Sequence, residues 1–580
     1  MRTVFSKEEL SEKEISIQNM IKDEIVDEFS SNNGIKEDFI LFICQPLYER
    51  LSVIIPISKI LEYLEIDIIF IPGEKYEIID FLTDNELDYR FHLYSFNIDL
   101  IPLDNDLISL EKENNFKKIY LNNEISAIND FANSFIKLEA CYGKIKHKYL
   151  KGSKAKIFND FLIEKEKEIN LKTNDEIFGM ICIDRSIDFL TPLTNNYTYE
   201  GLIDDNFGIN KGNIIIDDSY FKEKEFAVDD SPNKLILYSL NSYNNEFFSK
   251  IRCMHYLDAN SYLYETKKYF IEKAQEPDDN EKLNFEMIQK NIEEINTFVS
   301  LYRGPIVVNT KIMNKIIKEN VKEENMIYRR FESNLLSGDR QKNLDVYYSD
   351  YMSDKKDLNK LLNLMCIESL TQNGIKYYYN LKRDILNIYG YQNIFLLRDL
   401  ESISLIKDKG SSKKPEIPYH QLCSKLNLIN PKFTKENITD CSYIYRGYCP
   451  LMLRLIELAL QGKWNKIKDI LIKIPGETTF PSDERVIFEQ NNKIKTIFVV
   501  FIGGVSYNEI EGIRYLNLRL KQVFDTSKEK INSRIQLIIV TDEILNRKRI
   551  FNSLGKKFEQ KYSYKKWFAD MIEQKNKKKK

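Results

Sequence analysis

Two short apolar runs near the start of the chain are typical of buried parallel strands. They cover Phe39–Cys44 and Ile66–Ile71, and Val53–Leu64 between them has apolar residues at helical spacing. Two buried strands joined by a helix form a βαβ unit, which predicts a parallel sheet. We expect a further strand at Asn97–Pro102.

A second set of apolar runs lies in two distant parts of the chain. The runs are Ile177–Asp184, Lys234–Leu240, Thr496–Ile502 and Ile535–Val540. Ser506 and Glu509 have the spacing of a capping box, so a helix is expected to begin there and to continue to about Lys521. This helix and the last two runs form a second βαβ unit. It is expected to complete a sheet that begins before residue 240, which makes this domain discontinuous.

Between these two parts, from about residue 245 to 480, apolar residues recur at helical spacing. Leu358, Leu361, Leu362 and Met365 lie at i, i+3, i+4 and i+7, the spacing of one buried stripe. We interpret such stripes as packing faces rather than cofactor sites. The expected architecture is α/β, followed by α/β with a long helical insertion.

The composition argues against several classes of protein. The 85 Lys and Arg residues nearly balance the 88 Asp and Glu residues, whereas a nucleic-acid-binding protein usually has a basic face. The longest apolar runs fall well short of the roughly 18 residues of a transmembrane helix. The N-terminus has no signal-peptide h-region, and the eight cysteines form no Cys-x-x-Cys pair. These features predict a soluble cytoplasmic protein with reduced thiols.

Two motifs at predicted strand ends are candidates for chemistry. Gly503-Gly504, between a strand and a helix, offers backbone amides that could bind a phosphate. No Lys or Arg follows in Val505–Asn508, and the alternative is a tight turn that brings the helix close to its strand. Asp184 and Asp188 could serve as a phosphoryl nucleophile or as metal ligands. The alternative for them is an ion bridge to Arg185 between them.

The histidines and cysteines predict no metal site. The chain has four histidines, of which His255 lies near Cys253 and His420 lies near Cys423. Neither pair has a second pair of ligands nearby to complete a zinc site. The acidic cluster Asp278–Glu281 lacks the spacing of an EF-hand loop. We therefore expect no catalytic residue, no cofactor and no metal, and hence no enzyme.

Tyrosine is abundant, with 35 residues, and three tyrosines lie close together in one predicted loop. Tyr443, Tyr445 and Tyr448 precede Pro450, which is placed to begin a helix. Tyrosine is enriched at the centres of protein interfaces, so this loop could contact a partner. The alternative is that the three rings wedge the loop into the core of the domain.

Several stretches together resemble the SM (Sec/Munc) family, the regulators of SNARE-driven membrane fusion. The first is Asp184–Pro192, followed by Thr198–Asp204. The further matching stretches are Asp99–Ser109, Ile385–Tyr391, Ser442–Leu451 and Phe498–Val505, in the family's order. A chance match to one stretch is plausible, but a chance match to all of them is not. The vacuolar branch of the family is the most similar.

The resemblance implies an arch of three domains, of fold class α/β plus α. Two α/β domains have sheets of the parallel type, and a mostly helical third domain is inserted into the second. We expect the N-terminal α/β domain at residues 1–150 and the second α/β domain at 151–245 and 480–580. The helical domain is expected at 246–479, with subdomains at about 246–355 and 356–479.

The resemblance also implies a function without catalysis. Members of the family bind SNARE proteins of the Qa and R types, template their assembly and protect the bundle from disassembly. The vacuolar member is the SM subunit of the HOPS and CORVET tethering complexes, held there by the tail of vacuolar protein sorting-associated protein 16. The chain is therefore expected to be recruited through its partners to endosome, lysosome or vacuole membranes. Two alternatives stay open: a tether scaffold that has lost SNARE binding, and a phosphate-using α/β enzyme.

Two sets of residues are predicted to contact these partners. A basic set could line a helix that meets the acidic flanks of SNARE motifs, or could form a solvated face. It consists of Arg303, Lys311, Lys315 and Lys318. The tyrosines of the 443–448 loop are predicted to contact the tether subunit.

Two departures from the family are expected to change these contacts. The stretch from Tyr76 to Phe96 is too short for a full strand–helix unit, which argues against binding of a closed syntaxin in the cleft of the first domain. Ser300–Asn309, where the family's helical hairpin would turn, is short and carries apolar residues. This departure is expected to alter the geometry of R-SNARE binding.

Overall fold

The computed structural model describes most of the chain. The described residues are 39–44, 65–71, 76–96, 99–169, 177–217, 235–240, 245–275, 303–338, 343–410, 415–430, 440–482, 495–526 and 535–555, with single positions between 46 and 58. They divide into two units, one before residue 100 and one from Leu100 onward.

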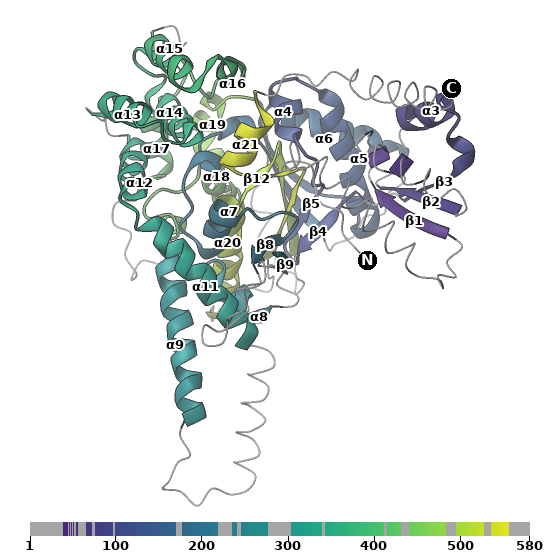
Figure 1. The fold of residues 1–580 in the computed structure, drawn as a ribbon, viewed down its shortest axis with the longest axis horizontal. Coiled ribbons are helices and arrows are strands. Elements are labelled where there is room, and N and C mark those ends of the chain that lie inside the picture. The colour runs from purple at the N-terminus through teal and green to yellow at the C-terminus, as the bar shows by residue number, and fades with distance from the viewer. Residues whose placement is uncertain are drawn as a thin grey trace, which may run out of the picture. The chain divides into compact units, whose positions relative to one another are not determined.

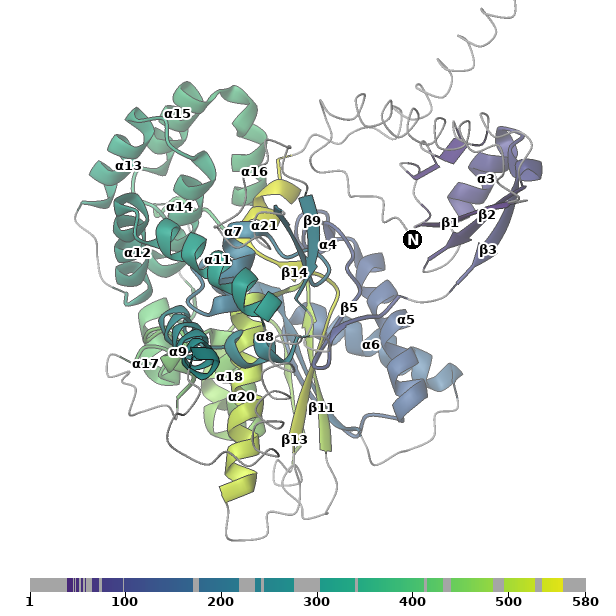
Figure 2. The ribbon, with the colours of Figure 1, turned by 60° about the horizontal axis from the view of Figure 1, so that its bottom comes forward.

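The first unit contains a three-stranded parallel sheet in the order β1-β2-β3. Its elements are β1 (Phe39–Cys44), β2 (Glu65–Phe70), α3 (Tyr76–Asp84), the 3₁₀ helix η2 (Asp88–Arg90) and β3 (Phe91–Ser95). Ile66, Ile68 and Phe70 alternate along β2 and are buried on one face of the sheet. They share a core with Ile78 and Leu82 of α3, which lies along that face (Figure 2). The predicted parallel sheet is confirmed.

The stretch between Tyr76 and Phe96 holds one helix and one strand, so the prediction that it is too short for a strand–helix unit is wrong. The helix has nine residues and the strand has five. Their connection is short enough for both to fit. The helix predicted at Val53–Leu64 lies largely outside the described residues.

The second unit is built on a seven-stranded sheet in the order β10-β6-β7-β11-β13-β5-β4. In chain order these strands are β4 (Ile101–Asp104), β5 (Leu107–Ser109), β6 (His147–Lys151), β7 (Ile177–Asp184), β10 (Thr478–Thr479), β11 (Lys495–Ile502) and β13 (Ile535–Thr541). The five central strands are parallel, and β10 and β4 at the edges are antiparallel to their neighbours. β7 pairs directly with β11, so two distant parts of the chain share one sheet. The apolar runs predict this discontinuity.

The boundary of the first domain lies near residue 99 rather than at the predicted residue 150. The strands β4, β5 and β6 pair within the sheet of the second unit, where β5 joins β13 and β6 joins β7.

The run at Lys234–Leu240 also differs from expectation. As β9 (Leu235–Ser239) it pairs with β8 (Asn213–Asp217) in a separate two-stranded ribbon. Its side chains alternate between exposed and half-buried, unlike those of a strand covered on both faces.

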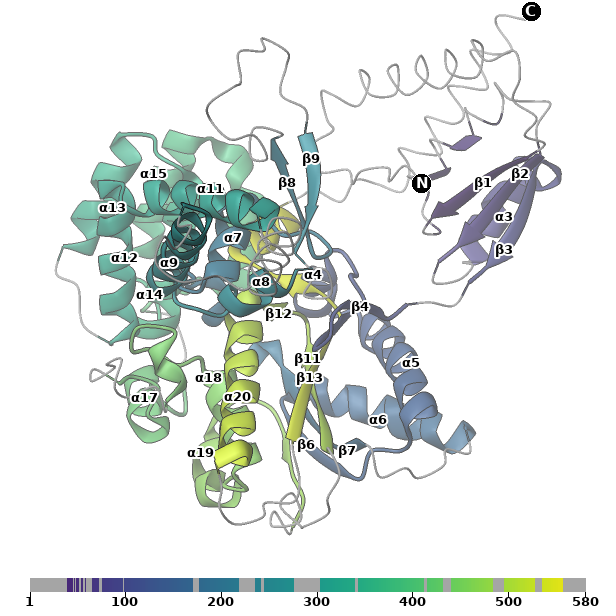
Figure 3. The same ribbon diagram turned by 90° about the horizontal axis from the view of Figure 1, so that it is seen from below.

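Helices cover both faces of the seven-stranded sheet, which is why its central strands are continuous apolar runs (Figure 3). Alternate residues of β7 and β11 enter different cores. Met180 and Phe498 pack in one core with residues of α5 (Ile125–Tyr142) and α6 (Ser153–Glu168). Ile181 and Val499 pack on the other face with residues of α18 (Leu451–Leu460) and α20 (Tyr507–Thr526).

The described parts of the region between β9 and β10 are mostly helical, as predicted. Its longer helices are α9 (Tyr256–Gln275), α11 (Arg303–Asn320), α12 (Glu323–Leu336), α13 (Leu344–Ser353), α14 (Leu358–Gln372), α15 (Tyr378–Tyr389), α16 (Ile394–Ser402), α17 (Tyr419–Leu426) and α18. Shorter elements of the unit are α4 (Asn115–Tyr120), α7 (Tyr199–Phe207), α8 (Glu246–Ile251), η6 (Tyr391–Asn393), α19 (Lys468–Lys473), β12 (Val505–Ser506), β14 (Ile544–Leu545) and α21 (Arg547–Ser553). α9 lies beside α11 and projects from the body of the unit, whereas α11 packs against that body (Figure 1).

Only the last part of the stretch Ser300–Asn309, where a hairpin turn is expected, lies within the described residues. Its described part, from Arg303 onward, is the start of α11. Ile306 and Val308 are buried there in the core that also contains Ile181 and Val499, which we call the main core. This burial explains the apolar character of the stretch. The expected effect of this stretch on the geometry of R-SNARE binding stays a prediction.

Candidate functional site

The motif Asp184–Asp188 at the end of β7 stabilises a turn. Its two carboxylates are not available for a reaction. Asp184 accepts hydrogen bonds from the Tyr120 hydroxyl (2.7 Å) and from the amides of Lys154 and Ser186 (both 2.9 Å). Asp188 accepts from the amides of Leu190 and Thr191 (both 3.0 Å) and from the Thr191 hydroxyl (2.7 Å). Both carboxylates are buried and fully engaged within the chain. This argues against a role as nucleophile or metal ligand.

Arg185 forms no ion pair with either neighbouring aspartate, so the predicted ion bridge is wrong. Its side chain is fully buried and makes a bidentate ion pair with Glu509 of α20, with both N–O distances at 2.7 Å. The guanidinium also donates hydrogen bonds to the backbone carbonyls of Gly504 and Asp188. Glu509 also accepts from the Ser506 amide at 2.9 Å, as the predicted capping box requires. The pair joins the end of β7 to the start of α20.

The amides that could bind a phosphate are occupied by a side chain of the same chain. The N–H groups of Gly503 and Gly504 donate to the carboxylate of Asp542 at 2.8–3.1 Å. Burial raises the pKa of Asp542 to about 6. A Cβ atom on Gly503 would lie 2.3 Å from the ring of Tyr120, so this is a tight turn at a positive φ of 84°. The alternative interpretation holds, and this turn gives no support to a phosphate-using enzyme.

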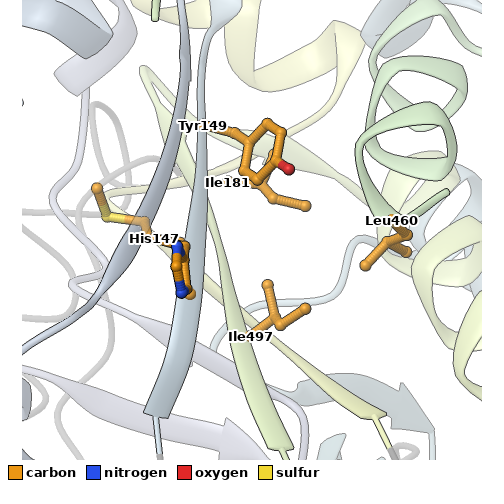
Figure 4. A pocket seen from close by; sticks show the side chains of 7 residues that line it. His147, Tyr149, Ile181, Leu460 and Ile497 are labelled. Atoms are coloured by element: carbon orange, nitrogen blue, oxygen red, sulfur yellow. The ribbon is translucent and has the colours of Figure 1, made fainter. Parts of the chain in front are cut away.

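The described residues offer no metal centre, and a cavity that they enclose is small. They contain no group of three or more His, Cys, Asp or Glu residues that could hold a metal ion, and Asp278–Glu281 lies outside them. A cavity between β6, β7, β11 and α18 is lined by His147, Tyr149, Gly179, Met180, Ile181, Leu460 and Ile497 (Figure 4). Its volume is about 10 Å³, room for at most about one water molecule. Within the described part of the chain, no helix is both long and apolar enough to cross a membrane.

The tyrosines of the 443–448 loop lie mostly inside the molecule. Tyr445 and Tyr448 are 6% and 8% exposed, and burial raises the pKa of both hydroxyls. The Tyr445 hydroxyl donates to the Asn508 carbonyl of α20. The predicted tether contact of these two residues is corrected, because a buried ring offers no surface to a partner; the loop is wedged into the core. Tyr443 is half-buried and donates to Asp258 at 3.2 Å, and its role in tether binding stays a prediction.

The basic set predicted to meet SNARE motifs lies on α11. Lys311, Lys315 and Lys318 are spaced at i, i+4 and i+7, so they share one face of the helix. Lys311 is half-buried, whereas Lys315 and Lys318 are exposed. The Lys315 ammonium lies 4.3 Å from the centre of the Phe207 ring. Arg303 is the first residue of α11, and its side chain lies outside the described part of the structure.

The α9–α11 pair, residues 256–275 and 303–320, combines this basic face with apolar groups. Ile312, Met313 and Ile316 anchor α11 in the main core. On α9, Leu257 and Tyr264 are 46% and 68% exposed and lie seven residues apart, on one side of the helix. This side of α9 is not among the predicted contact residues, although its two apolar residues have helical spacing.

A second exposed surface with apolar side chains lies on η6 and α16. Tyr391 is 69% exposed and Ile394 is 42% exposed. With the exposed Arg398 they are spaced at i, i+3 and i+7, and we call these three residues the Tyr391 ridge. Tyr391 also donates to the Asn387 side chain at 3.0 Å. Tyr391 ends one of the stretches that resemble the SM family, but it is not among the predicted contact residues.

A buried charge network at the base of the α9–α11 pair also escaped prediction. Arg514 of α20 pairs with Glu200 (2.5 Å), Asp106 (3.0 Å), Glu511 (3.1 Å) and Asp104 (3.4 Å). Arg252, which immediately follows α8, also pairs with Asp104. Burial raises the pKa of Glu200. The network ties α7 and α20 to the segment that leads into α9.

Comparison with known proteins identifies the family. The sequence model of the Sec1 family matches residues 1–553. The chain is 30% identical over 463 residues to vacuolar protein sorting-associated protein 33A of Rattus norvegicus, covering 76% of this chain and 74% of the relative. It is 24% identical over 498 residues to the vacuolar protein-sorting-associated protein 33 homolog of Arabidopsis thaliana, covering 82% and 79%.

Solved structures show the same fold at low sequence identity. A chain of the Unc18–syntaxin 1 complex from Monosiga brevicollis is similar with a TM-score of 0.57 and 12% identity, covering 93% of this chain and all of the other. The SM protein Vps45 in complex with the Qa SNARE Tlg2 gives a TM-score of 0.53 and 13% identity, covering 90% and 88%. These likenesses confirm the predicted fold class, α/β plus α with sheets of the parallel type. With a family match over nearly the whole sequence, the chain belongs to the Sec1 family.

Proposed function

We propose that this protein is a non-enzymatic SM protein that binds and templates SNARE helices during vesicle docking and fusion. It acts at endosomal, lysosomal or vacuolar membranes as the SM subunit of a HOPS or CORVET tethering complex. The observation that carries this proposal is the similarity over about three quarters of the chain to a vacuolar protein sorting-associated protein 33. The occupied Gly503-Gly504 turn and the engaged carboxylates after β7 support a role without catalysis.

The α9–α11 pair is the proposed SNARE surface. A SNARE motif is an amphipathic helix, and such a helix binds to a surface that combines apolar groups with charged rims. Leu257 and Tyr264 supply exposed apolar area on α9, and Lys315 and Lys318 supply exposed positive charge on α11. Acidic flanks of Qa and R SNAREs would meet this basic face.

The Tyr391 ridge is the proposed contact with the tether subunit, vacuolar protein sorting-associated protein 16. An exposed aromatic ring beside an aliphatic side chain and an arginine has the composition of an interface hot spot. The three side chains are accessible, unlike Tyr445 and Tyr448. The ridge therefore replaces these two tyrosines as the proposed tether contact, and recruitment to the membrane would follow from this partner.

The two surfaces can be tested with separate pairs of substitutions. We expect Lys315→Glu/Lys318→Glu to weaken SNARE binding about tenfold or more while tether binding is unchanged, because each reversal replaces an attraction with a repulsion. Tyr391→Ala/Ile394→Ala should do the opposite. Binding of the purified chain to SNARE motifs and to the C-terminal fragment of protein 16 can be measured by calorimetry.

Matched controls distinguish an effect of the substituted surface from a general effect of changed charge or lost apolar area. Lys466→Glu/Lys468→Glu makes the same charge change on another exposed segment, and Ile472→Ala/Leu518→Ala removes other exposed apolar side chains. Neither control should change binding. If the α11 variant binds SNARE motifs as well as its control does, the proposed SNARE surface is wrong; if the chain binds the tether fragment but no SNARE motif, it is a scaffold.

A further inference from the structure

Two arginines of the second unit lie against one tyrosine ring without a carboxylate partner. The guanidinium carbons of Arg329 on α12 and of Arg446 in the 443–448 loop are each 5.7 Å from the centre of the Tyr197 ring. Arg446 is exposed, and Arg329 and Tyr197 are half-buried, so solvent reaches all three side chains. Among the described residues, no Asp or Glu forms an ion pair with either guanidinium.

Neighbouring side chains hold both guanidiniums in place. The Nε–H group of Arg446 donates to Nε2 of His255 at 3.0 Å, and Nη2 of Arg329 donates to Oδ1 of Asn320 at 2.7 Å. Each guanidinium keeps further N–H groups that donate to none of the described side chains. Arg446 also has a φ of 56°, a left-handed conformation that is uncommon for a residue other than Gly. The fold thus holds two positively charged donor groups beside the ring.

Two neutral donors at the same place also lack an acceptor. Asn320 is 9% exposed, and its Nδ2 atom is buried without a hydrogen-bond partner, although its Oδ1 atom accepts from Arg329. The Tyr197 hydroxyl forms no hydrogen bond within the described part of the chain. A buried donor without an acceptor is costly, and most such groups in folded proteins are bonded to something. The arrangement therefore fits a ligand that supplies acceptor atoms and negative charge.

We propose that these four side chains bind the phosphoryl group of a phosphate monoester. Such a group carries a charge of about −1.5 to −2 at pH 7 and three strong acceptor oxygens, which matches two guanidiniums and two neutral donors. Arginine binds phosphate through two parallel hydrogen bonds, whereas a carboxylate would bring only one charge and two oxygens. Glu332, one turn along α12, does not take this place, because its carboxylate accepts from Asn195. The inference is independent of the proposed function.

The proposal can be tested by calorimetric titration of the full chain with inorganic phosphate at constant ionic strength. We expect saturable binding with a dissociation constant below about 1 mM. Arg446→Gln should weaken binding about tenfold or more, because it removes charge-assisted hydrogen bonds from an exposed position. Tyr197→Phe keeps the ring and should weaken binding about threefold through loss of the hydroxyl. Arg330→Gln makes the same charge change at an exposed neighbour on α12 and should weaken binding less than about twofold.

Two further titrations distinguish the sources of the phosphoryl group. Glycerol phosphate represents a soluble ester, and phosphatidylcholine vesicles with and without a phosphatidylinositol monophosphate represent a lipid headgroup. Whichever source binds, Arg446→Gln and Tyr197→Phe should weaken its binding, and Arg330→Gln should not. No binding in any of these titrations, or equal losses for Arg446→Gln and Arg330→Gln, would overturn the proposal. Thermal melts without phosphate check that each variant is folded, and Tyr197→Phe decides the outcome if Arg446→Gln is not.

Discussion

Replacement of Arg185 by Met should destabilise the second unit strongly. The Arg185 guanidinium is fully buried and makes two 2.7 Å bonds to Glu509, which is 1% exposed. Methionine fills most of the space of the arginine stem but leaves the Glu509 charge buried without its partner. Breaking a buried pair in this way costs about 3–5 kcal/mol, whereas loss of an exposed pair costs about 0–1 kcal/mol.

Urea unfolding followed by tryptophan fluorescence can measure this cost. The chain has two tryptophans, and Trp567→Phe would leave Trp464, which is fully buried in the second unit against Tyr149. The control is Arg383→Met, which removes the exposed pair with Asp384. Arg185→Lys should fall between, because lysine cannot form the bidentate pair. A loss below about 1 kcal/mol for Arg185→Met, or a loss equal to that of the control, would refute this account of the pair.

Two further predictions concern buried groups of the second unit. Glu332 is buried and accepts hydrogen bonds from Asn195, and burial raises its pKa to about 7. A carboxyl with a raised folded-state pKa loses its contribution to stability as the pH rises through that pKa, so the free energy of unfolding should fall by about 2–3 kcal/mol between pH 5 and 8 through this group. Glu332→Gln should flatten that slope in denaturant titrations, and an unchanged slope would contradict the assignment. Gly512→Ala places a Cβ 2.3 Å from the Tyr445 hydroxyl and should lower the free energy of unfolding by about 1–3 kcal/mol. Tyr445→Phe in the same chain should recover part of this loss. If thermal melts show that the stability losses of the two substitutions simply add in the double variant, the clash is not their cause.

The strands of the central sheet were predictable because both faces of the sheet are covered. Ile177–Asp184, Thr496–Ile502 and Ile535–Val540 are nearly continuous apolar runs, and each forms a central strand. Short or peripheral strands give a weaker signal. β5 has three residues, so its pairing with β13 could not be read from its own pattern. For this reason the apolar pattern does not show that the first unit ends near residue 99 rather than at residue 150.

The roles of polar residues were harder to predict, because they depend on partners that are distant in sequence. Arg185 forms an ion pair with Glu509, and the Gly503-Gly504 turn donates hydrogen bonds to Asp542. Spacing along the chain shows neither pair. A tyrosine in a loop serves equally well in a core or at an interface, so only the burial of Tyr445 distinguishes the two.

The most direct test of the proposed function is the binding of the purified chain to two partners at physiological salt. One is the C-terminal fragment of vacuolar protein sorting-associated protein 16 from the same organism, and the other is a panel of Qa and R SNARE motifs. We predict saturable binding to the fragment and to at least one SNARE motif, with both partners bound at the same time. If the chain failed to bind one or both of these partners, the proposal that this Sec1-family chain is the SM subunit of a tether would be contradicted.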